Sequence, residues 1–389
     1  MATSSFSFLR GAAGLMARDL AGLPSTDLRV QLAGDAHLAN FGVFGAPGDE
    51  MVFDVDDFDE TLPGPWEWDL KRLAVSLVVA GPIVGLGPRE SRRIAQLAVR
   101  TYRRLMARLA TLPYLAVWSF HLDRRTVERH ARRGAVRELR HELERSGRPG
   151  GWSVMPRYVT SRHRRWRIRD EPPLLVHPGG SHDLEEAHTL FEAYSASLDE
   201  TVRGFLARYR VVDVARKVVG VGSVGTDCRV LLLMGDDDVE DPLLLQVKEA
   251  RPSVLEPYLG APIYPSPAER VVYGQRAIQE APDPFLGWST LADRHYYVRQ
   301  LRDRRYTPAP DRMDARALRG HGMLAGAALA RAHARTGSAA MIAGYLGNRP
   351  TVDDAFADFA MSYAPQVHDD YTALLRAIRR GRLPAVSAV

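Results

Sequence analysis

The sequence contains almost no cysteine, and this scarcity excludes several classes of protein. Cys228 is the single cysteine among 389 residues, so neither an intrachain disulfide nor a cysteine-rich zinc site can form. Long uncharged stretches are also missing, because the longest runs only from Leu73 to Pro88 and is broken by prolines and glycines. A membrane-spanning helix needs about 20 apolar residues. We therefore expect a cytoplasmic protein with no membrane partner.

Lysine is nearly as scarce as cysteine. Only Lys71, Lys217 and Lys248 are lysines among the 52 basic residues, and all the others are arginine. This chain therefore supplies an ordinary positive charge as arginine, and each lysine requires a more specific reason. One such reason is shape, because the compact ammonium group fits where the planar guanidinium of arginine does not.

The net charge of +5 is concentrated in one segment of an otherwise ordinary soluble composition. Residues 100–169 contain 19 basic and 5 acidic residues. Trp166 stands among arginines there, a combination that could bind nucleic acid by stacking on a base. The alternative, which we prefer, is a set of solvated helix faces with a lid on the acceptor side. Nucleic acid is thus an unlikely partner that the sequence alone does not exclude.

The hydrophobic pattern predicts a helical part, a sheet part and a second helical part, which is the α+β class. We assign them to residues 1–205, 206–302 and 303–389. Helices are expected at 8–23, 66–80, 89–110, 184–209, 266–279, 318–335, 352–363 and 369–379. Strands are expected at 29–32 and 51–55, and at 211–219, 229–234, 243–247, 288–291 and 296–301. The last five predict a five-stranded antiparallel sheet with one helix, whereas residues 146–181 indicate a long loop.

A glycine-rich motif follows the first strand of this sheet. Residues 220–225 match G-x-G-x-x-G, in which Gly220, Gly222, Ser223 and Gly225 are the candidates for covering a nucleotide's phosphates. A dinucleotide-binding motif opens a helix, whereas the glycine loop of a protein kinase joins two strands. The residues after Gly225 predict a strand, which favours the kinase interpretation. A simple glycine-rich hairpin is the alternative.

The third strand of the sheet ends at Lys248, in a segment similar to the V-A-I-K strand of kinases. In kinases the lysine of this strand binds the α and β phosphates of ATP. The same role would explain why Lys248 is a lysine in a chain that otherwise uses arginine. An acid on the following helix would fix its position. Glu269 is the first candidate for this acid, with Glu256 and Glu280 as rivals, and a solvated helix residue is the alternative for Glu269.

The N-terminal part carries a second group of polar residues. Asp35 and Asn40 have the D-x-x-x-x-N spacing of a kinase catalytic loop, in which the Asp receives the substrate's hydroxyl proton and the Asn binds magnesium. Asp57 follows 17 residues later, just beyond a strand. Oxygen ligands from two segments are what a hard cation such as magnesium requires. The sequence therefore predicts Asn40 and Asp57 as metal ligands.

The choice among neighbouring acids is open at this point. Five acids stand in the seven residues from Asp54 to Glu60, and so much negative charge favours a bound cation over a solvated turn. Asp54 is best framed by apolar strand residues, whereas Asp56 points to the opposite face of the strand from Asp57. Asp57 is our first choice and Asp54 the second.

These motifs resemble those of two families. GDAHLANFG, FDVDDFDE and GPWEWDLKRLA are similar to the bacterial domain-of-unknown-function family numbered 2252, over nearly the whole chain. They also resemble aminoglycoside phosphotransferases, in which a further Asp, here Asp69, follows the metal Asp by a spacing close to the 12 residues seen from Asp57. Ala33 departs from that family, which has a histidine there.

The order of the motifs also departs from the kinase pattern, because the glycine loop and lysine follow the catalytic loop. A circular permutation would reconcile the two orders. The helix that ends at His333 resembles the one that normally leads into the catalytic loop. The resemblance thus implies a circularly permuted, two-lobe protein-kinase-like fold, with a helical lobe built from both chain ends.

The resemblance implies an ATP- and magnesium-dependent phosphotransferase that acts on a hydroxyl group. The acceptor is left open, since a small molecule and a protein fit equally well. Transfer of AMP in the same cleft is one alternative function. A catalytically inactive kinase-like protein that binds nucleotide or nucleic acid is another.

Overall fold

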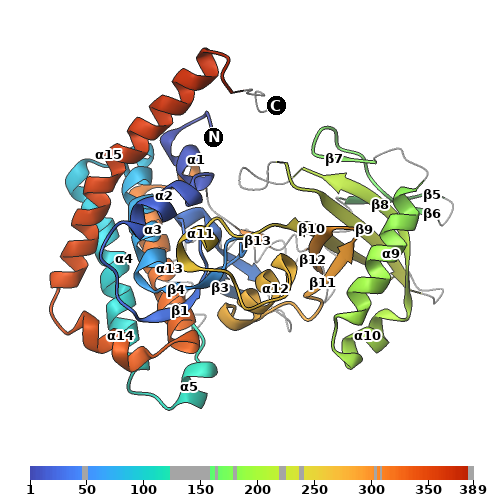
Figure 1. Cartoon of the computed structure of the whole chain (residues 1–389), viewed down its shortest axis with the longest axis horizontal. Coiled ribbons are helices and arrows are strands. Elements are labelled where there is room, and N and C mark those ends of the chain that lie inside the picture. The colour runs from blue at the N-terminus through green and yellow to red at the C-terminus, as the bar shows by residue number, and fades with distance from the viewer. Residues whose placement is uncertain are drawn as a thin grey trace.

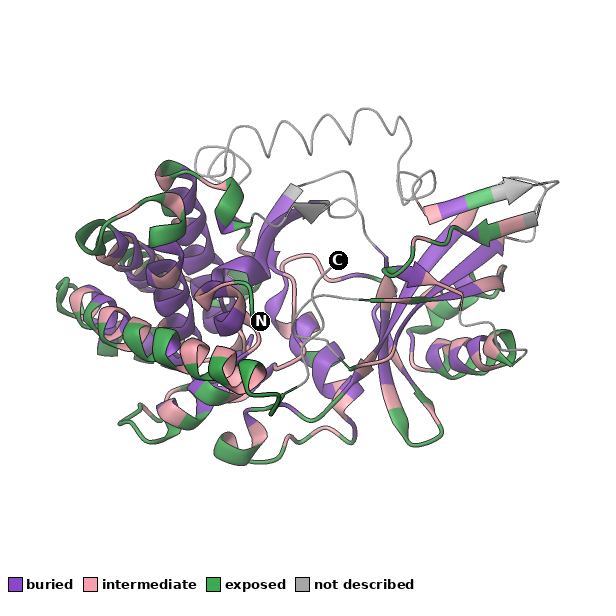
Figure 2. Ribbon diagram, turned by 90° about the horizontal axis from the view of Figure 1, so that it is seen from above, coloured by how far each residue is buried: buried purple, intermediate pink, exposed green. Residues whose placement is uncertain are grey.

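The computed structural model describes most of the chain. The described ranges are 1–45, 51–122, 158–162, 165–177, 182–218, 225–235, 241–301, 305–306 and 309–383. Figure 1 shows a mainly helical part beside a part dominated by one sheet, which confirms the α+β class. Buried residues concentrate on the inner helices of the first part and along the strands of the second (Figure 2).

The helical part is built from both ends of the chain (Figure 1). α3 (Glu67–Ala80) and α4 (Pro88–Leu109) precede the large sheet in sequence, and they pack against α13 (Ala315–Thr336) and α15 (Thr351–Arg379), which follow it. Leu73, Val99 and Leu329 are fully buried in their common core. This part also contains α1 (Ser5–Arg10), α2 (Ala13–Ala21), α5 (Tyr114–Trp118) and α14 (Ala339–Leu346).

Two small antiparallel sheets lie in the helical part and align two loops. β1 (Arg29–Leu32) pairs with β4 (Leu62–Pro65), and β2 (Phe41–Gly45) lies between β3 (Met51–Val55) and β13 (Arg305–Tyr306). Leu32 pairs with Leu62, while Phe41 pairs with Val55. The loop of residues 33–40 and the loop of residues 56–61 therefore start and end on the same strand pairs and lie against each other.

The large sheet has six antiparallel strands in the order β11-β12-β10-β9-β8-β7. Their bounds are β7 (Leu175–Val176), β8 (Tyr209–Lys217), β9 (Cys228–Gly235), β10 (Pro242–Ala250), β11 (Gly287–Leu291) and β12 (Arg294–Gln300). The prediction of five strands is wrong, because β7 adds a sixth beside β8. β7 has two residues, too few for an alternating pattern to be visible in the sequence.

Each face of this sheet is covered by a different element. Leu243, Leu245 and Val247 of β10 face α9 (Asp183–Ala196) and α10 (Glu200–Leu206), with which they share a core. Leu244 points to the opposite face, under the hairpin of β5 (Val159–Arg162) and β6 (Arg165–Ile168). Packing therefore assigns α9 and α10 to the sheet part, although the predicted boundary at residues 205 and 206 placed them with the helices.

α12 (Pro267–Ile278) lies between the two parts (Figure 1), and it confirms the helix expected at residues 266–279. Its residues Ala268, Val271 and Val272 belong to the core of the helical part. α12 is preceded by the short helix α11 (Glu256–Leu259). The sheet part is therefore joined to the helical part by a shared apolar core.

Four predictions about secondary structure need correction. The helices expected at residues 8–23 and 184–209 are each divided in two, into α1 and α2 and into α9 and α10. Residues 352–363 and 369–379 form one continuous helix, α15, because Pro365 is accommodated inside it. Residues 146–181 are not purely a loop, since their described portion contains β5, β6 and β7. Within the described part of the chain, no helix is both long and apolar enough to cross a membrane.

α13 packs so closely on α4 at Gly326 that adding a single methyl group there should lower the stability of the fold. A Cβ at Gly326 would lie 2.4 Å from the carbonyl oxygen of Ala98, which is backbone and cannot rotate away. We expect Gly326→Ala to lower the free energy of unfolding by about 1–3 kcal/mol in urea denaturation. Gly344→Ala in α14 is the matched control: nothing lies within 4 Å of its new Cβ, so stability should stay equal or rise. Equal effects of the two variants would contradict this packing.

Candidate functional site

The loop of residues 33–40 is held by one carboxylate of α3. Ala33 and Gly34 donate their backbone N–H groups to Asp69, at 2.7 and 3.0 Å. Gly34 has φ +85°, and a Cβ there would lie 2.1 Å from the carbonyl oxygen of Glu60. Only glycine fits this position. The conformation of the loop is thus set both by Asp69 and by direct contact with the loop of residues 56–61.

Asp69 is in turn held by α13, a helix that follows the large sheet in sequence. The Nε2 atom of His333 lies 3.2 Å from its carboxylate, and the Nδ1 atom of the same ring lies 2.9 Å from the hydroxyl of Tyr102. All three side chains are buried. An element from the far end of the sequence therefore supports a loop near its beginning.

Asp35 lies within this loop, in an environment of basic groups. Its Oδ1 atom accepts a hydrogen bond of 2.7 Å from Arg72 of α3, and its Oδ2 atom lies 3.7 Å from Nε2 of His37. Arg72 is fixed by a second bond, of 2.6 Å, to the carbonyl of Leu9. Asn40 donates its side-chain N–H to the backbone carbonyl of Asp35 at 2.7 Å. The amide oxygen of Asn40 is then available as a metal ligand.

The β2–β3 hairpin brings Asn40 and the acidic loop together. The register that pairs Phe41 with Val55 continues with a hydrogen bond of 3.0 Å from the N–H of Asp56 to the carbonyl of Asn40. Asp57 follows directly, and its Oδ1 atom accepts the N–H of Asp59 at 3.1 Å. Among the described residues, no group of three or more His, Cys, Asp or Glu side chains could hold a metal by itself. The arrangement thus provides an amide and a carboxylate oxygen, which suits magnesium shared with a phosphate.

Asp54, the second choice as metal ligand, has a different role. Its carboxylate is fully buried and accepts a hydrogen bond of 2.6 Å from Arg331 of α13, which is also fully buried. The backbone N–H of Glu280 donates to the same carboxylate oxygen at 2.7 Å. Asp54 therefore anchors β3 to the helical core, and the structure does not support its assignment as a metal ligand.

Lys248 reaches the acidic loop from β10. Its ammonium group forms an ion pair with Asp59, and Tyr297 of β12 donates its hydroxyl to the other oxygen of Asp59 at 3.0 Å. Burial opposes the charge of Lys248, but Tyr297, Asp57 and Asp59 outweigh it, so its pKa lies well above the ordinary value. The ion pair of Lys248 with Asp59 therefore connects β10 to the acidic loop that carries Asp57.

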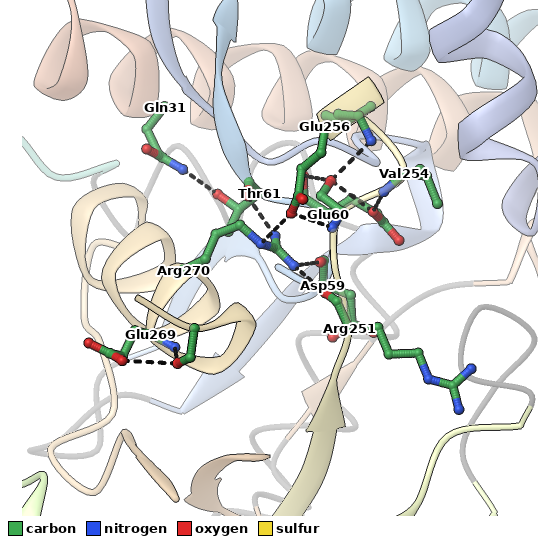
Figure 3. Close-up of polar contacts among 12 residues, drawn as sticks. Gln31, Asp59, Glu60, Thr61, Arg251, Val254, Glu256, Glu269 and Arg270 are labelled. Atoms are coloured by element: carbon green, nitrogen blue, oxygen red, sulfur yellow. Dashed lines mark hydrogen bonds and ion pairs between the residues drawn. The ribbon is translucent and has the colours of Figure 1, made fainter. Parts of the chain in front are cut away.

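Glu269 does not pair with Lys248, contrary to the sequence prediction. It belongs to the first turn of α12, where its carboxylate accepts the hydroxyl of Ser266 at 3.0 Å and its N–H bonds back at 3.2 Å. This reciprocal pair caps the helix, and Figure 3 shows it apart from the acidic loop. The rival acids are also engaged elsewhere: Glu256 lies 3.7 Å from Arg270, and Glu280 lies 3.0 Å from His121.

The neighbouring residue Arg270 is the one that reaches the acidic loop from α12 (Figure 3). Its guanidinium is fully buried and donates to the carbonyl oxygens of Asp59 and Thr61, both at 2.7 Å, and of Arg251 at 2.8 Å. Arg251 follows the end of β10, the strand that carries Lys248. One arginine thus ties α12, the acidic loop and β10 together.

A second arginine holds the other side of the acidic loop. Arg299 of β12 donates to the carbonyl of Asp56 at 3.1 Å and to the side chain of Gln246 at 3.2 Å. The main chain is therefore held by arginine on both sides of Asp57. Together with the bond from the N–H of Asp59 to Asp57, these contacts fix the backbone of the loop.

Part of the predicted site lies outside the described residues. Gly220, Gly222 and Ser223 fall there, as does most of the arginine-rich segment of residues 100–169. Gly225 is described, has φ +84°, and its carbonyl accepts a hydrogen bond from Arg251. Arg251, whose own carbonyl accepts a hydrogen bond from Arg270, therefore connects the end of the glycine motif to α12.

The sequence analysis missed Asp59, Arg270 and Arg299. Asp59 stands in the same acidic run as Asp57, so its position carried a usable signal. Arg270 and Arg299 are two among 49 arginines, and their targets are backbone carbonyls, which leave no trace in the sequence. Only the tertiary arrangement identifies them.

Glu60 gives the acidic loop a testable pH dependence. Burial raises its pKa from 4.5 to about 7, although hydrogen bonds from Val254 and Ser253 oppose the shift. Between these two pH values the folded protein binds a proton that the unfolded chain does not, so this residue's contribution to stability falls as the pH rises. Relative to Glu60→Gln, the wild type should lose about 3 kcal/mol of unfolding free energy from pH 4.5 to 8. Urea denaturation at several pH values measures this difference.

Glu192→Gln, at an exposed position of α9, is the control for that comparison. It should follow the wild type at every pH. Parallel stability curves for wild type and Glu60→Gln would show that Glu60 is not held as a buried acid.

Comparison with known proteins identifies one family. The model of the DUF2252 family, described as an uncharacterized protein conserved in bacteria, matches residues 1–377. No curated protein and no solved structure matches the chain. Because the family model spans nearly the whole sequence, the chain belongs to the DUF2252 family.

Proposed function

We propose that the protein is an ATP- and magnesium-dependent phosphotransferase that acts on a hydroxyl group. Asp35 orients or deprotonates the acceptor, Asn40 and Asp57 bind magnesium, and Lys248 neutralises the phosphates. The glycine motif of residues 220–225 covers them. Magnesium supplies charge neutralisation at the transferred phosphoryl group when it is bound.

One observation carries this proposal: three segments distant in sequence meet around Asp57. The loop of Asp35 and Asn40 contacts the acidic loop through the bond between Asp56 and Asn40. Lys248 approaches the same loop from the large sheet through Asp59. Phosphoryl transfer requires an acceptor-side carboxylate, a metal site and a phosphate-binding cation, and the candidates for all three lie on these connected segments.

The hydrogen bonds that hold the loop of residues 33–40 also agree with this proposal. Phosphoryl transfer depends on positioning and electrostatics more than on covalent chemistry. Asp69 holds the backbone of the Asp35 loop, and Arg72 holds the Asp35 carboxylate. The acceptor-side carboxylate is therefore oriented before any substrate binds.

A circularly permuted kinase-like fold accounts for the order of the motifs. His333, from α13, supports the loop of Asp35 through Asp69 although His333 and Asp35 lie about 300 residues apart. In a kinase with the usual order, such a helix leads directly into the catalytic loop. The six-stranded sheet and α12 take the place of the nucleotide-binding lobe, with Lys248 on a central strand.

The role of Asp35 can be tested by removing its charge. Asp35→Asn keeps the shape of the side chain but cannot accept a proton, so magnesium-dependent ATP consumption should fall at least a hundredfold. ATP binding should change little, because Asp35 lies on the acceptor side. Phosphoryl transfer releases ADP, whereas AMP transfer releases pyrophosphate and leaves AMP on the acceptor. Chromatographic detection of ADP together with a pyrophosphate assay therefore measures the rate and distinguishes the two reactions.

The exposed residue Asp293 provides the matched control for that variant. Asp293→Asn should retain the activity of the wild type. If Asp35→Asn consumed ATP at the wild-type rate, the assignment of Asp35 would be wrong.

The metal and phosphate ligands can be tested by thermal unfolding with ATP and magnesium, each alone and together. Ligands that bind the folded state raise the unfolding temperature by mass action, so the largest shift is expected with both. Asp57→Asn should abolish the part of the shift that depends on magnesium. Lys248→Met should reduce the shift with ATP itself. A wild type unaffected under all three conditions would contradict the proposed function.

A further inference from the structure

Lys71 is a scarce lysine that the proposed reaction does not use. It lies on α3, next to Arg72, and its ammonium lies 5.2 Å from the centre of the Phe359 ring. In the part of the chain that the structure describes, no hydrogen-bond acceptor or carboxylate is paired with this ammonium. Burial lowers the pKa of Lys71, against the opposing effect of Glu67. A lysine that served only to solvate the surface would extend into water.

Lys71 borders a cavity of about 700 Å³. Residues 24–28, the N-terminal part of α3, and residues of α14 and α15 line it. Met341 and Tyr345 of α14 line it and are about 60% and 59% exposed, so they offer uncovered apolar surface. A volume of this size is typical of small-molecule sites.

The polar groups of this cavity are unequally satisfied. The carboxylate of Glu67 already accepts two hydrogen bonds from Thr26, at 2.5 Å from its N–H and 2.9 Å from its hydroxyl. The indole N–H of Trp66, another lining residue, is buried and has no acceptor among the described residues. A buried donor without an acceptor costs free energy unless a ligand or water supplies one. The donors Lys71 and Trp66 therefore have no acceptor among the described residues, and the ammonium of Lys71, which is only partly buried, is the one that a ligand can reach.

We propose that this cavity binds a small anion with a flat apolar body, such as an aromatic carboxylate or sulfonate. The anionic group pairs with Lys71, and the apolar body lies on Tyr345 and Met341. The rim residue Asp27 is exposed and remains solvated. The inference is independent of phosphoryl transfer, because none of these residues belongs to the Asp35 or Lys248 group.

Fluorescence titration of the full chain with 8-anilinonaphthalene-1-sulfonate tests this site. The probe combines an aromatic body with a sulfonate, and we expect saturable binding. Lys71→Met keeps an apolar chain over Phe359 but removes the charge, so it should weaken binding at least tenfold. Lys217→Met, at a lysine in the large sheet, should bind as the wild type does.

Two further measurements separate specific recognition from adhesion to apolar surface. The neutral analogue N-phenyl-1-naphthylamine should bind wild type and Lys71→Met equally, because it lacks the anionic group. Tyr345→Ala, at an exposed position, should weaken both probes. Reductive methylation followed by peptide mass spectrometry should show that the sulfonate protects Lys71 and leaves Lys217 unprotected.

The proposal would be overturned by any of three results. These are binding of the sulfonate that does not saturate, equal sulfonate affinity in wild type and Lys71→Met, and methylation of Lys71 at the same rate with and without the probe. Circular dichroism of each variant verifies that it is folded, so a loss of binding is not a loss of structure.

Discussion

The negative charge of residues 54–60 is paired with basic side chains from both parts of the molecule, and these ion pairs connect the two parts. Five carboxylates stand between Asp54 and Glu60, and a folded chain cannot bury so much like charge unless partners surround it. The partners come from opposite directions. Arg331 of the helical part forms an ion pair with Asp54, whereas Lys248 of the sheet part forms one with Asp59. The segment that carries the candidate metal ligand is therefore also the segment on which both parts converge.

The arginines of the sheet part act on this segment through its backbone. Arg270 and Arg299 donate to carbonyl oxygens on both sides of Asp57. Burying a guanidinium costs several kcal/mol unless its hydrogen bonds are made, so these contacts resist any displacement of the loop. The consequence is an acidic loop held in place before a ligand binds, which is what the proposed electrostatic stabilisation of a transferred phosphoryl group would require.

Periodicity and motif spacing predicted much of this arrangement. They placed α3, α4, α12 and the five longer strands of the large sheet, and motif spacing selected Asp35, Asn40, Asp57 and Lys248 as one candidate group. They could not choose between Glu269 and Arg270, because neighbouring residues on a helix point about 100° apart and the orientation of α12 is set by tertiary packing. β7 was missed because two residues carry no periodicity. The ion pair of Asp54 with Arg331 joins residues 277 positions apart, so no local pattern could reveal it.

α3 links the loop of Asp35 to the cavity of Lys71. Asp69 and Arg72 face the loop, while Glu67 and Lys71 border the cavity. Since consecutive residues of a helix diverge around its axis, Lys71 and Arg72 serve different surfaces although they are adjacent in sequence. A ligand at Lys71 would act on Asp35 through α3 only if this helix moved. Leu73 and most other residues of α3 are fully buried in the helical core, and close packing there opposes such a movement.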